Sequence, residues 1–303
     1  MSKSVNRKMD KILRDEISGK TKTRYSNRIL RKLAANKLSV FGIVLFTIIL
    51  IMCFGAPLFT SHSPITMDLR NILSPPSSGN LLGTDRIGRD IFARILYGGR
   101  ISISIGLGSA LGATLIGVGF GIYAGYRGGI LDGIIMKVSE IMMSFPQIIL
   151  VLMLVTIAGQ SLWNLIYIFV LTGWPSMYRM ARSQMLSIRE EEYVLALRAF
   201  GINSFVIAFK HMLPNATGPI FVNITLSTAT FILQEAALSF LGLGVPLEIS
   251  TWGNILNAAQ NITILRGAWW VWLPTGIVIT LFVLSINFLG DGLRDAADPT
   301  QIG

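Results

Sequence analysis

The chain has 303 residues, of which 52% are hydrophobic and 14% are charged, and its mean hydropathy is +0.60. These values exclude a soluble enzyme and predict an all-α protein that crosses a membrane several times. The net charge of +10 does not indicate a nucleic-acid partner, because residues 1–38 alone hold 12 Lys and Arg against 3 Asp and Glu.

Residues 1–38 are therefore predicted to be a basic cytoplasmic tail, since Lys and Arg beside a first apolar run are typical of a cytoplasmic flank. Gly19, Lys20 and Thr21 resemble the end of a phosphate-binding loop, but Arg14 stands where its first glycine would be. We expect no ATP site in this chain. The apolar run that follows, residues 39–60, has the length of a first transmembrane helix.

Residues 61–99 are polar and are predicted to be extracytoplasmic. Near their end an apolar stripe lies opposite Arg89, Asp90 and Arg94; its members are Ile91, Phe92, Ile95 and Leu96. This pattern predicts a helix that lies at the outer interface of the membrane.

Five further apolar runs predict a total of six transmembrane helices, which places both ends of the chain on the same side. The runs are Ile101–Tyr126, Ile134–Ala158, Leu162–Met180, Gly218–Gly244 and Trp269–Leu289. With the ends in the cytoplasm, 20 Lys and Arg lie in cytoplasmic segments and 6 outside, as the positive-inside rule requires. Residues 293–303 then form a cytoplasmic C-terminal tail.

Small residues and prolines predict how these helices pack and bend. The pairs Gly108/Gly112 and Gly117/Gly121 have the four-residue spacing that lets two helix backbones approach closely in lipid. Pro146 and Pro175 are each expected to bend the helix that contains them. Such bends are compatible with a gate but are also common in inert membrane helices.

Residues 187–215, which we call the helix pair, are predicted to form two short cytoplasmic helices joined by a sharp elbow. Ser187 and Glu190 have the spacing of a capping box, so the first helix should begin near Ile188. Gly201 should end it in a left-handed conformation, and Asn203 should cap the second helix. Pro214 should then stop the second helix.

Glu235 is an acidic residue inside the fifth expected span, about two-thirds of the way across. A charge at this depth is costly, so it should face the interior of the helix bundle or a water-filled cavity. Glu235 is therefore a candidate for the translocation path. The alternative, a hydrogen-bonded residue with a packing role, stays open at this point.

The helix pair resembles the cytoplasmic loop of ABC importer permeases, and its form E-Y-V-x-A-x-R-A-x-G followed by H-x-L-P-N is similar to that of the peptide/nickel branch. The pattern G-T-D-x-x-G-R-D at 83–90 and the segment E-A-A-L-S-F-L-G-L-G at 235–244 resemble the same branch. The resemblance implies a type I importer fold, with residues 100–292 as its transmembrane core. It also implies that the matching residues dock on an ATPase and couple it to transport; they are Glu192, Tyr193, Ala196, Arg198, Ala199, Gly201, His211, Leu213 and Pro214.

The same resemblance implies the partners and the setting. A second homologous permease would complete a heterodimer in the bacterial cell membrane, two cytoplasmic ATPase subunits would bind ATP and Mg, and an extracytoplasmic binding protein would deliver di- or oligopeptides, nickel or a metallophore complex. No cofactor is expected on this chain, and no metal site. A secondary transporter of small solutes is the nearest alternative, but it would predict internally repeated halves. A membrane-embedded hydrolase is disfavoured because neither histidine lies in an expected span.

Overall fold

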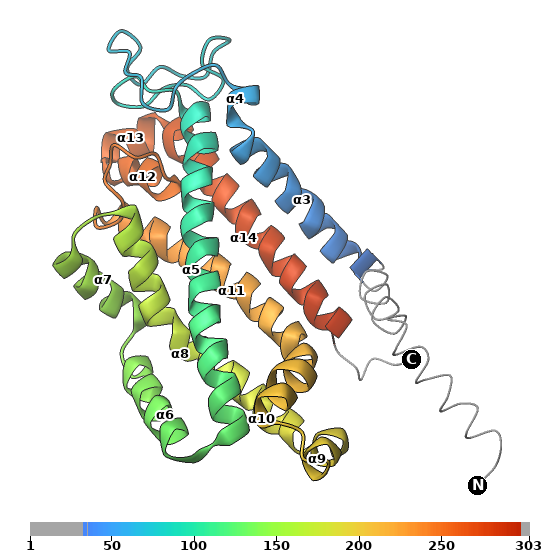
Figure 1. Ribbon diagram of the computed structural model, residues 1–303. Coiled ribbons are helices and arrows are strands. Elements are labelled where there is room, and N and C mark those ends of the chain that lie inside the picture. The colour runs from blue at the N-terminus through green and yellow to red at the C-terminus, as the bar shows by residue number, and fades with distance from the viewer. Residues whose placement is uncertain (1–32, 35, 298–303) are drawn as a thin grey trace.

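A computed structural model of the chain describes residues 33–34 and 36–297 (Figure 1). Most of the expected basic tail and the last six residues of the chain lie outside this part. Within the described residues the regular structure is helical, apart from one isolated β-bridge between Thr84 and Asp90. The predicted all-α class is confirmed.

The helices follow one another in a simple order, with one π-helical segment (η1) and one 3₁₀ segment (η2). Their bounds are α3 Lys37–Phe54, α4 Ala56–Phe59, α5 Ile91–Arg127, α6 Gly129–Met143, α7 Gln147–Ala158, α8 Leu162–Arg189, α9 Glu192–Ala199, α10 Ser204–Val206, η1 Ile207–Met212, α11 Leu213–Phe240, α12 Trp252–Leu256, η2 Asn257–Gln260, α13 Ile262–Gly267 and α14 Trp269–Ala297.

Four of the described helices are long and apolar enough to cross a membrane: α3, α5, the continuous helix Ser204–Phe240, and α14. The helices α6 and α7 pass the same test together, but they are bent by 88° at Pro146, and they make a fifth span if they act as one. The 28-residue α8 is not among these helices. Its C-terminal half carries Arg179, Arg182 and Arg189, which lower its hydropathy. The six expected spans are thus not confirmed, whereas the bend at Pro146 is.

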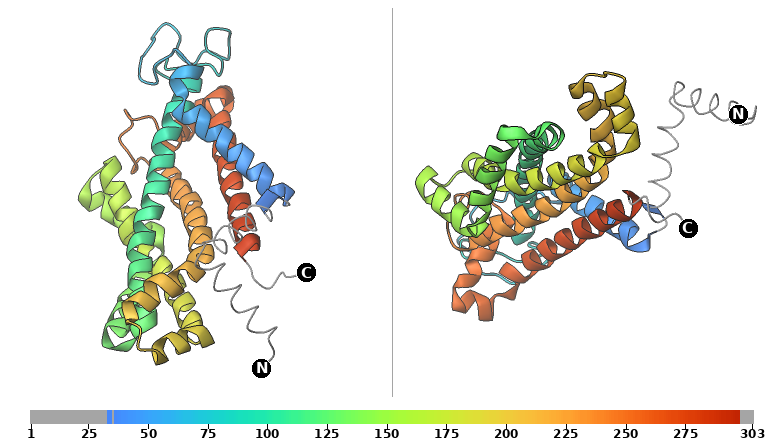
Figure 2. Two further views of the ribbon diagram at one scale, coloured as in Figure 1. Left: turned by 45° about the vertical axis from the view of Figure 1, so that its right-hand side comes forward. Right: turned by 90° about the horizontal axis from the view of Figure 1, so that it is seen from below.

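The long helix α5 runs from the loop that precedes it to the end of the molecule that holds the helix pair (Figure 1), and it packs mainly against α8, α11 and α3. One cluster of buried side chains joins α5 to α7, α8 and α11, and it contains the stacked pair Phe169 and Phe231. A second cluster joins α5 and α11 to α3 and α14 through Trp252 and Phe282. The loop before α5 lies at one end of the bundle and the helix pair at the other (Figures 1 and 2).

The contact of α5 with α8 depends on glycine. A Cβ atom added at Gly117, Gly121 or Gly125 would lie 2.5–2.6 Å from a Cβ atom of Met177, Ala181 or Met185 on α8. These three glycines therefore let the two backbones touch, as the spacing predicted for the pair Gly117/Gly121. The prediction was wrong for Gly108, where an added Cβ atom meets nothing within 4 Å.

The expected interfacial helix is not a separate element. Its residues form the first turns of α5, which begins at Ile91 and continues without a break. Arg94 is not solvated but 3% exposed, because its guanidinium lies 2.6 Å from Asp85. Because Asp85 pairs with the charge of Arg94, this turn can be buried. The expected boundary between 61–99 and 100–292 falls inside α5, which begins at Ile91.

The pattern G-T-D-x-x-G-R-D builds a cap over the start of α5. Gly83 and Gly88 both have positive φ (71° and 78°), and a Cβ atom at Gly88 would overlap the carbonyl oxygen of Asp68. The Asp90 side chain accepts from the Ala93 N–H at 2.7 Å and so caps the helix. Asp85 accepts from Arg89 at 2.8 Å and from Arg94. The motif is thus a structural device that fixes this loop on α5.

The close contact of α5 with α8 at Gly117, Gly121 and Gly125, which we call the seam, predicts opposite effects for two glycine substitutions. Gly121→Ala should lower stability by about 1–3 kcal/mol, the usual cost of overpacking. Gly108→Ala, on the same helix but in open space, should be neutral or raise stability by about 0.5–1 kcal/mol through helix propensity. Thermal unfolding of the detergent-purified variants measures both, and equal melting temperatures would contradict the assigned seam.

The cap predicts a pH dependence. Burial alone would raise the pKa of Asp85, but the guanidinium of Arg94 and the backbone N–H and charge of Arg89 lower it below its usual range. Since the folded-state pKa lies below the unfolded value of about 3.9, the ionised form stabilises the fold at neutral pH and this contribution is lost as the pH falls below about 4.

Asp85→Asn should therefore destabilise the protein by about 3 kcal/mol at pH 7, because it leaves Arg94 buried without its partner. The difference from wild type should shrink on acidification below about pH 4. Unfolding curves at a series of pH values test this, and a difference that does not change with pH would refute the role of the ion pair.

Candidate functional site

The first helix of the pair begins later than the capping box predicts. Ser187 and Ile188 belong to α8, which continues to Arg189, and α9 begins at Glu192 after a turn with no side-chain cap. Ile188 packs against the buried cluster beneath α9. That burial favours the extension of α8 over an early start of the next helix, so the capping-box prediction was wrong.

The predicted elbow is present. Gly201 has a φ of 73°, its N–H donates to the Arg198 carbonyl at 2.9 Å, and the next N–H, that of Ile202, donates to the Leu197 carbonyl at 3.2 Å. This is the usual left-handed helix end. The Asn203 side chain then accepts from the Phe205 N–H at 2.8 Å and caps α10, as expected.

Pro214 does not stop the second helix. Residues 204–240 are one helix of 37 residues, because α10, η1 and α11 follow one another directly. Pro214 lies in the first turn of α11, directly after the π-helical turn Ile207–Met212. A proline is tolerated in a first helical turn, and a π-helical turn changes the hydrogen-bonding partners before it. The second half of the helix pair is therefore continuous with a membrane helix.

Three contacts hold α9 in place. Val194 is fully buried in a cluster with Met185 of α8 and with Ile207 and Met212 of η1. The Tyr193 hydroxyl accepts from Asn215 Nδ2 at 2.7 Å. These contacts tie α9 to both neighbouring membrane helices.

The third contact is electrostatic. The Arg198 guanidinium lies over the ring of Tyr126 on α5, 4.8 Å from its centroid, which is a cation–π arrangement. Motif matching named Tyr193 and Arg198 as docking residues but missed Val194 as the anchor. The apolar pair Val194 and Leu197, three residues apart on one helical face, was the available pattern.

The structure brings the predicted docking residues together around the elbow. His211 and Leu213 are partly buried, and the remaining seven are exposed: Glu192, Tyr193, Ala196, Arg198, Ala199, Gly201 and Pro214. Beside them lie large apolar side chains that the motif did not identify. Phe200 is 82% exposed, Phe205 68% and Leu195 47%. The outer surface of the helix pair is thus apolar and uncovered in the described chain.

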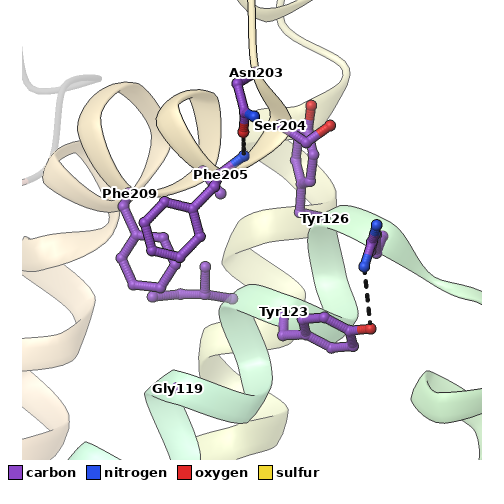
Figure 3. Close-up of a pocket in the computed structure, with 10 residues that line it drawn as sticks. Gly119, Tyr123, Tyr126, Asn203, Ser204, Phe205 and Phe209 are labelled. Atoms are coloured by element: carbon purple, nitrogen blue, oxygen red, sulfur yellow. Dashed lines mark hydrogen bonds between the residues drawn. The ribbon is translucent and has the colours of Figure 1, made fainter.

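A cavity of about 480 Å³ lies between the helix pair and the lower end of α5 (Figure 3). The rings of Phe205 and Phe209 form one side, with their centroids 4.4 Å apart, and Tyr123 and Tyr126 of α5 form the other. Among the described residues no group of three His, Cys, Asp or Glu side chains could hold a metal ion. The cavity lies beside the buried cluster that joins Ile122 of α5 to Ile207 and Ala208 of η1.

Glu235 lies away from this site, in the upper half of α11. It is fully buried, and its two carboxylate oxygens accept from Ser102 Oγ of α5 at 3.0 Å and from Ser239 Oγ at 2.8 Å. The Ser102 hydroxyl also accepts from the Trp252 N–H of α12 at 3.1 Å. A side chain without accessible surface does not line an open path, so the geometry favours the packing role over the expected cavity-facing one.

The hydrogen bonds of Glu235 predict how two substitutions differ. Glu235→Gln keeps an acceptor for one hydroxyl and should change stability little, whereas Glu235→Leu leaves the hydroxyl hydrogens of Ser102 and Ser239 without their acceptor and should cost about 1–3 kcal/mol. Melting temperatures and transport rates of both variants in the assembled transporter test this. Stable, well-expressed variants that both lose transport would return Glu235 to the translocation path.

Two family models match the chain. The Binding-protein-dependent transport system inner membrane component matches residues 117–302, and the N-terminal TM domain of oligopeptide transport permease C matches residues 25–76. Among solved structures, the inward-facing MetNI methionine ABC transporter is similar at a TM-score of 0.54 and 20% identity, over 67% of this chain and 96% of that one. That likeness concerns the fold alone.

Curated relatives are more similar in sequence. The dipeptide transport system permease protein DppC of Bacillus subtilis is 38% identical over 99% of this chain and 91% of its own length, and the oligopeptide permease OppC of the same organism is 39% identical over 94% and 92%. A putative peptide permease protein of Brucella suis is 41% identical over 91% and 90%. The chain therefore belongs to the family of binding-protein-dependent transport system inner membrane components, among the dipeptide and oligopeptide permeases.

Proposed function

We propose that this chain is one of two homologous permeases that together form the membrane path of an ATP-driven importer of di- or oligopeptides in the bacterial cell membrane. The names of its relatives support peptides as the substrate class. None of them is a secondary transporter, so that alternative has no support. The broken pair α6–α7 and the long α8 would complete a six-span topology with both ends in the cytoplasm.

The observation that carries the mechanism is the position of the helix pair. Its exposed apolar surface, around Phe200 and Ala196, needs a partner, and its second helix is continuous with α11. An ATPase that docks on this surface and changes its position pulls directly on a membrane helix. The bound ATP and Mg belong to two such cytoplasmic subunits, and an extracytoplasmic binding protein delivers the peptide at the opposite end.

Transmission requires a fixed angle between α9 and α10, and Gly201 sets that angle. A Cβ atom at Gly201 would meet nothing within 4 Å, so any effect of substitution comes from the positive φ and not from a clash. A β-branched residue strongly resists this conformation, whereas asparagine tolerates it.

Gly201→Val should therefore accumulate normally but lose peptide uptake and binding-protein-stimulated ATPase activity together, with a reduction of about tenfold or more. Gly201→Asn should retain both. The assay is uptake and ATP hydrolysis by the complete transporter in proteoliposomes. Wild-type activity of a well-expressed Gly201→Val variant would show that the helix pair does not couple the subunits.

A further inference from the structure

Polar residues recur along one face of α11. Asn223, Ser227, Thr230 and Gln234 are spaced by four, three and four residues, and we call them the polar stripe. At about 100° per residue they fall within about 60° of one another on the helix. All four are partly or fully exposed, whereas Thr228 and Glu235 beside them are buried.

A face of this kind is unfavourable against lipid. Polar residues within a membrane helix face the interior of a bundle or a water-filled cavity, because hydrocarbon offers their donors and acceptors no partner. The described helices of this chain leave the stripe partly open. Packing within this chain thus accounts for the burial of Glu235, which its neighbours enclose. It does not account for the four residues of the polar stripe, which stay partly exposed.

The upper end of the stripe has an acceptor without a donor. Gln234 Nε2 donates to Gln147 Oε1 at 3.2 Å, and Gln147 Nε2 donates to Thr172 Oγ1 at 3.4 Å. Within the part of the chain that the structure describes, the buried Gln234 Oε1 has no hydrogen-bond partner. Gln147 is the first residue of α7, directly after the 88° break (Figure 1). The unused acceptor of Gln234 therefore lies where the polar stripe meets the break between α6 and α7.

We propose that the polar stripe lines the route of the substrate and recognises the backbone amide groups of a peptide; this rests on the proposed function. The stripe offers neutral donors and acceptors and no His, Cys, Asp or Glu, which suits amide groups and not a bare cation. Its length of about 16 Å, at 1.5 Å per residue, matches four to five residues of an extended peptide. Recognition through the peptide backbone tolerates many side chains.

The first test removes two hydroxyl groups from the stripe. Ser227→Ala/Thr230→Val should lower the uptake of radiolabelled trialanine by about tenfold in proteoliposomes that contain the complete transporter, since two hydrogen bonds to substrate are lost. Thr280→Val is the matched control. Thr230 and Thr280 are both exposed, and each hydroxyl donates to the carbonyl four residues earlier at 2.9 Å. Thr280→Val, on α14, should transport at the wild-type rate.

The second test measures access to water. A charged, membrane-impermeant thiol reagent in a detergent-solubilised complex should modify Ser227→Cys and spare Thr228→Cys, whose native residue is 4% exposed. The native Cys53 is 1% exposed and adds little background. An unreactive Ser227→Cys variant, or wild-type uptake by the double variant, overturns the proposal.

Loss of the second permease from the purified double variant also overturns it and assigns the stripe to the subunit interface. Failure of the proposed function gives a different result, because the wild-type complex itself would then not take up trialanine. The two hypotheses are thus separated by the wild-type measurement alone.

Discussion

The close approach of α5 and α8 determines where the other helices can lie. Three glycines four residues apart, from Gly117 to Gly125, bring the two backbones together over the lower half of α5. The side chains of α8 that meet them, such as Met177 and Met185, are consequently buried. Arg182 of the same helix turns toward α6 and binds Asp132 through two bonds of 2.6 Å. The seam therefore also fixes α6 and the turn from which α9 begins.

Different kinds of interaction hold the loops at the two ends of the bundle. In the loop before α5, the charges of Asp85 and Arg94 are buried against each other, so the loop is held by a pair that is strong only when complete. At the helix pair, Val194 is held by non-directional apolar contacts, and the Tyr193 hydroxyl accepts from Asn215 Nδ2 and donates to the His211 carbonyl. The first arrangement resists movement, and the second permits α9 to shift without breaking a buried ion pair, which the proposed coupling role requires.

Local rules predicted the features that depend on one or two neighbouring residues. The left-handed end at Gly201, the cap at Asn203 and the bend at Pro146 follow from backbone chemistry that tertiary contacts do not override. The failures share a different cause. Whether Arg94 is solvated and which glycines of α5 meet α8 depend on residues far away in the sequence, and no local pattern contains them.

The proposed docking surface shows the same division. The motif named residues around the elbow, but not the exposed Phe200 and Phe205 or the buried Val194, because a motif records residue identity and not exposure. Pro214 is the instructive case. The proline rule correctly indicates a disturbance at this point, and the structure accommodates it with a π-helical turn in place of a break.

That π-helical turn has a consequence for the direction in which α9 points. A π turn accommodates one residue more than the equivalent α-helical turn, so it changes the rotational setting of everything on one side of it by about 100° relative to the other. Loss of a single residue between 207 and 212 would leave a sequence fully able to form an unbroken α-helix. The membrane portion would be unchanged, while the docking surface would face another side of the molecule. The direction of the proposed docking surface thus depends on the number of residues in one turn, and not on the chemistry of that surface itself.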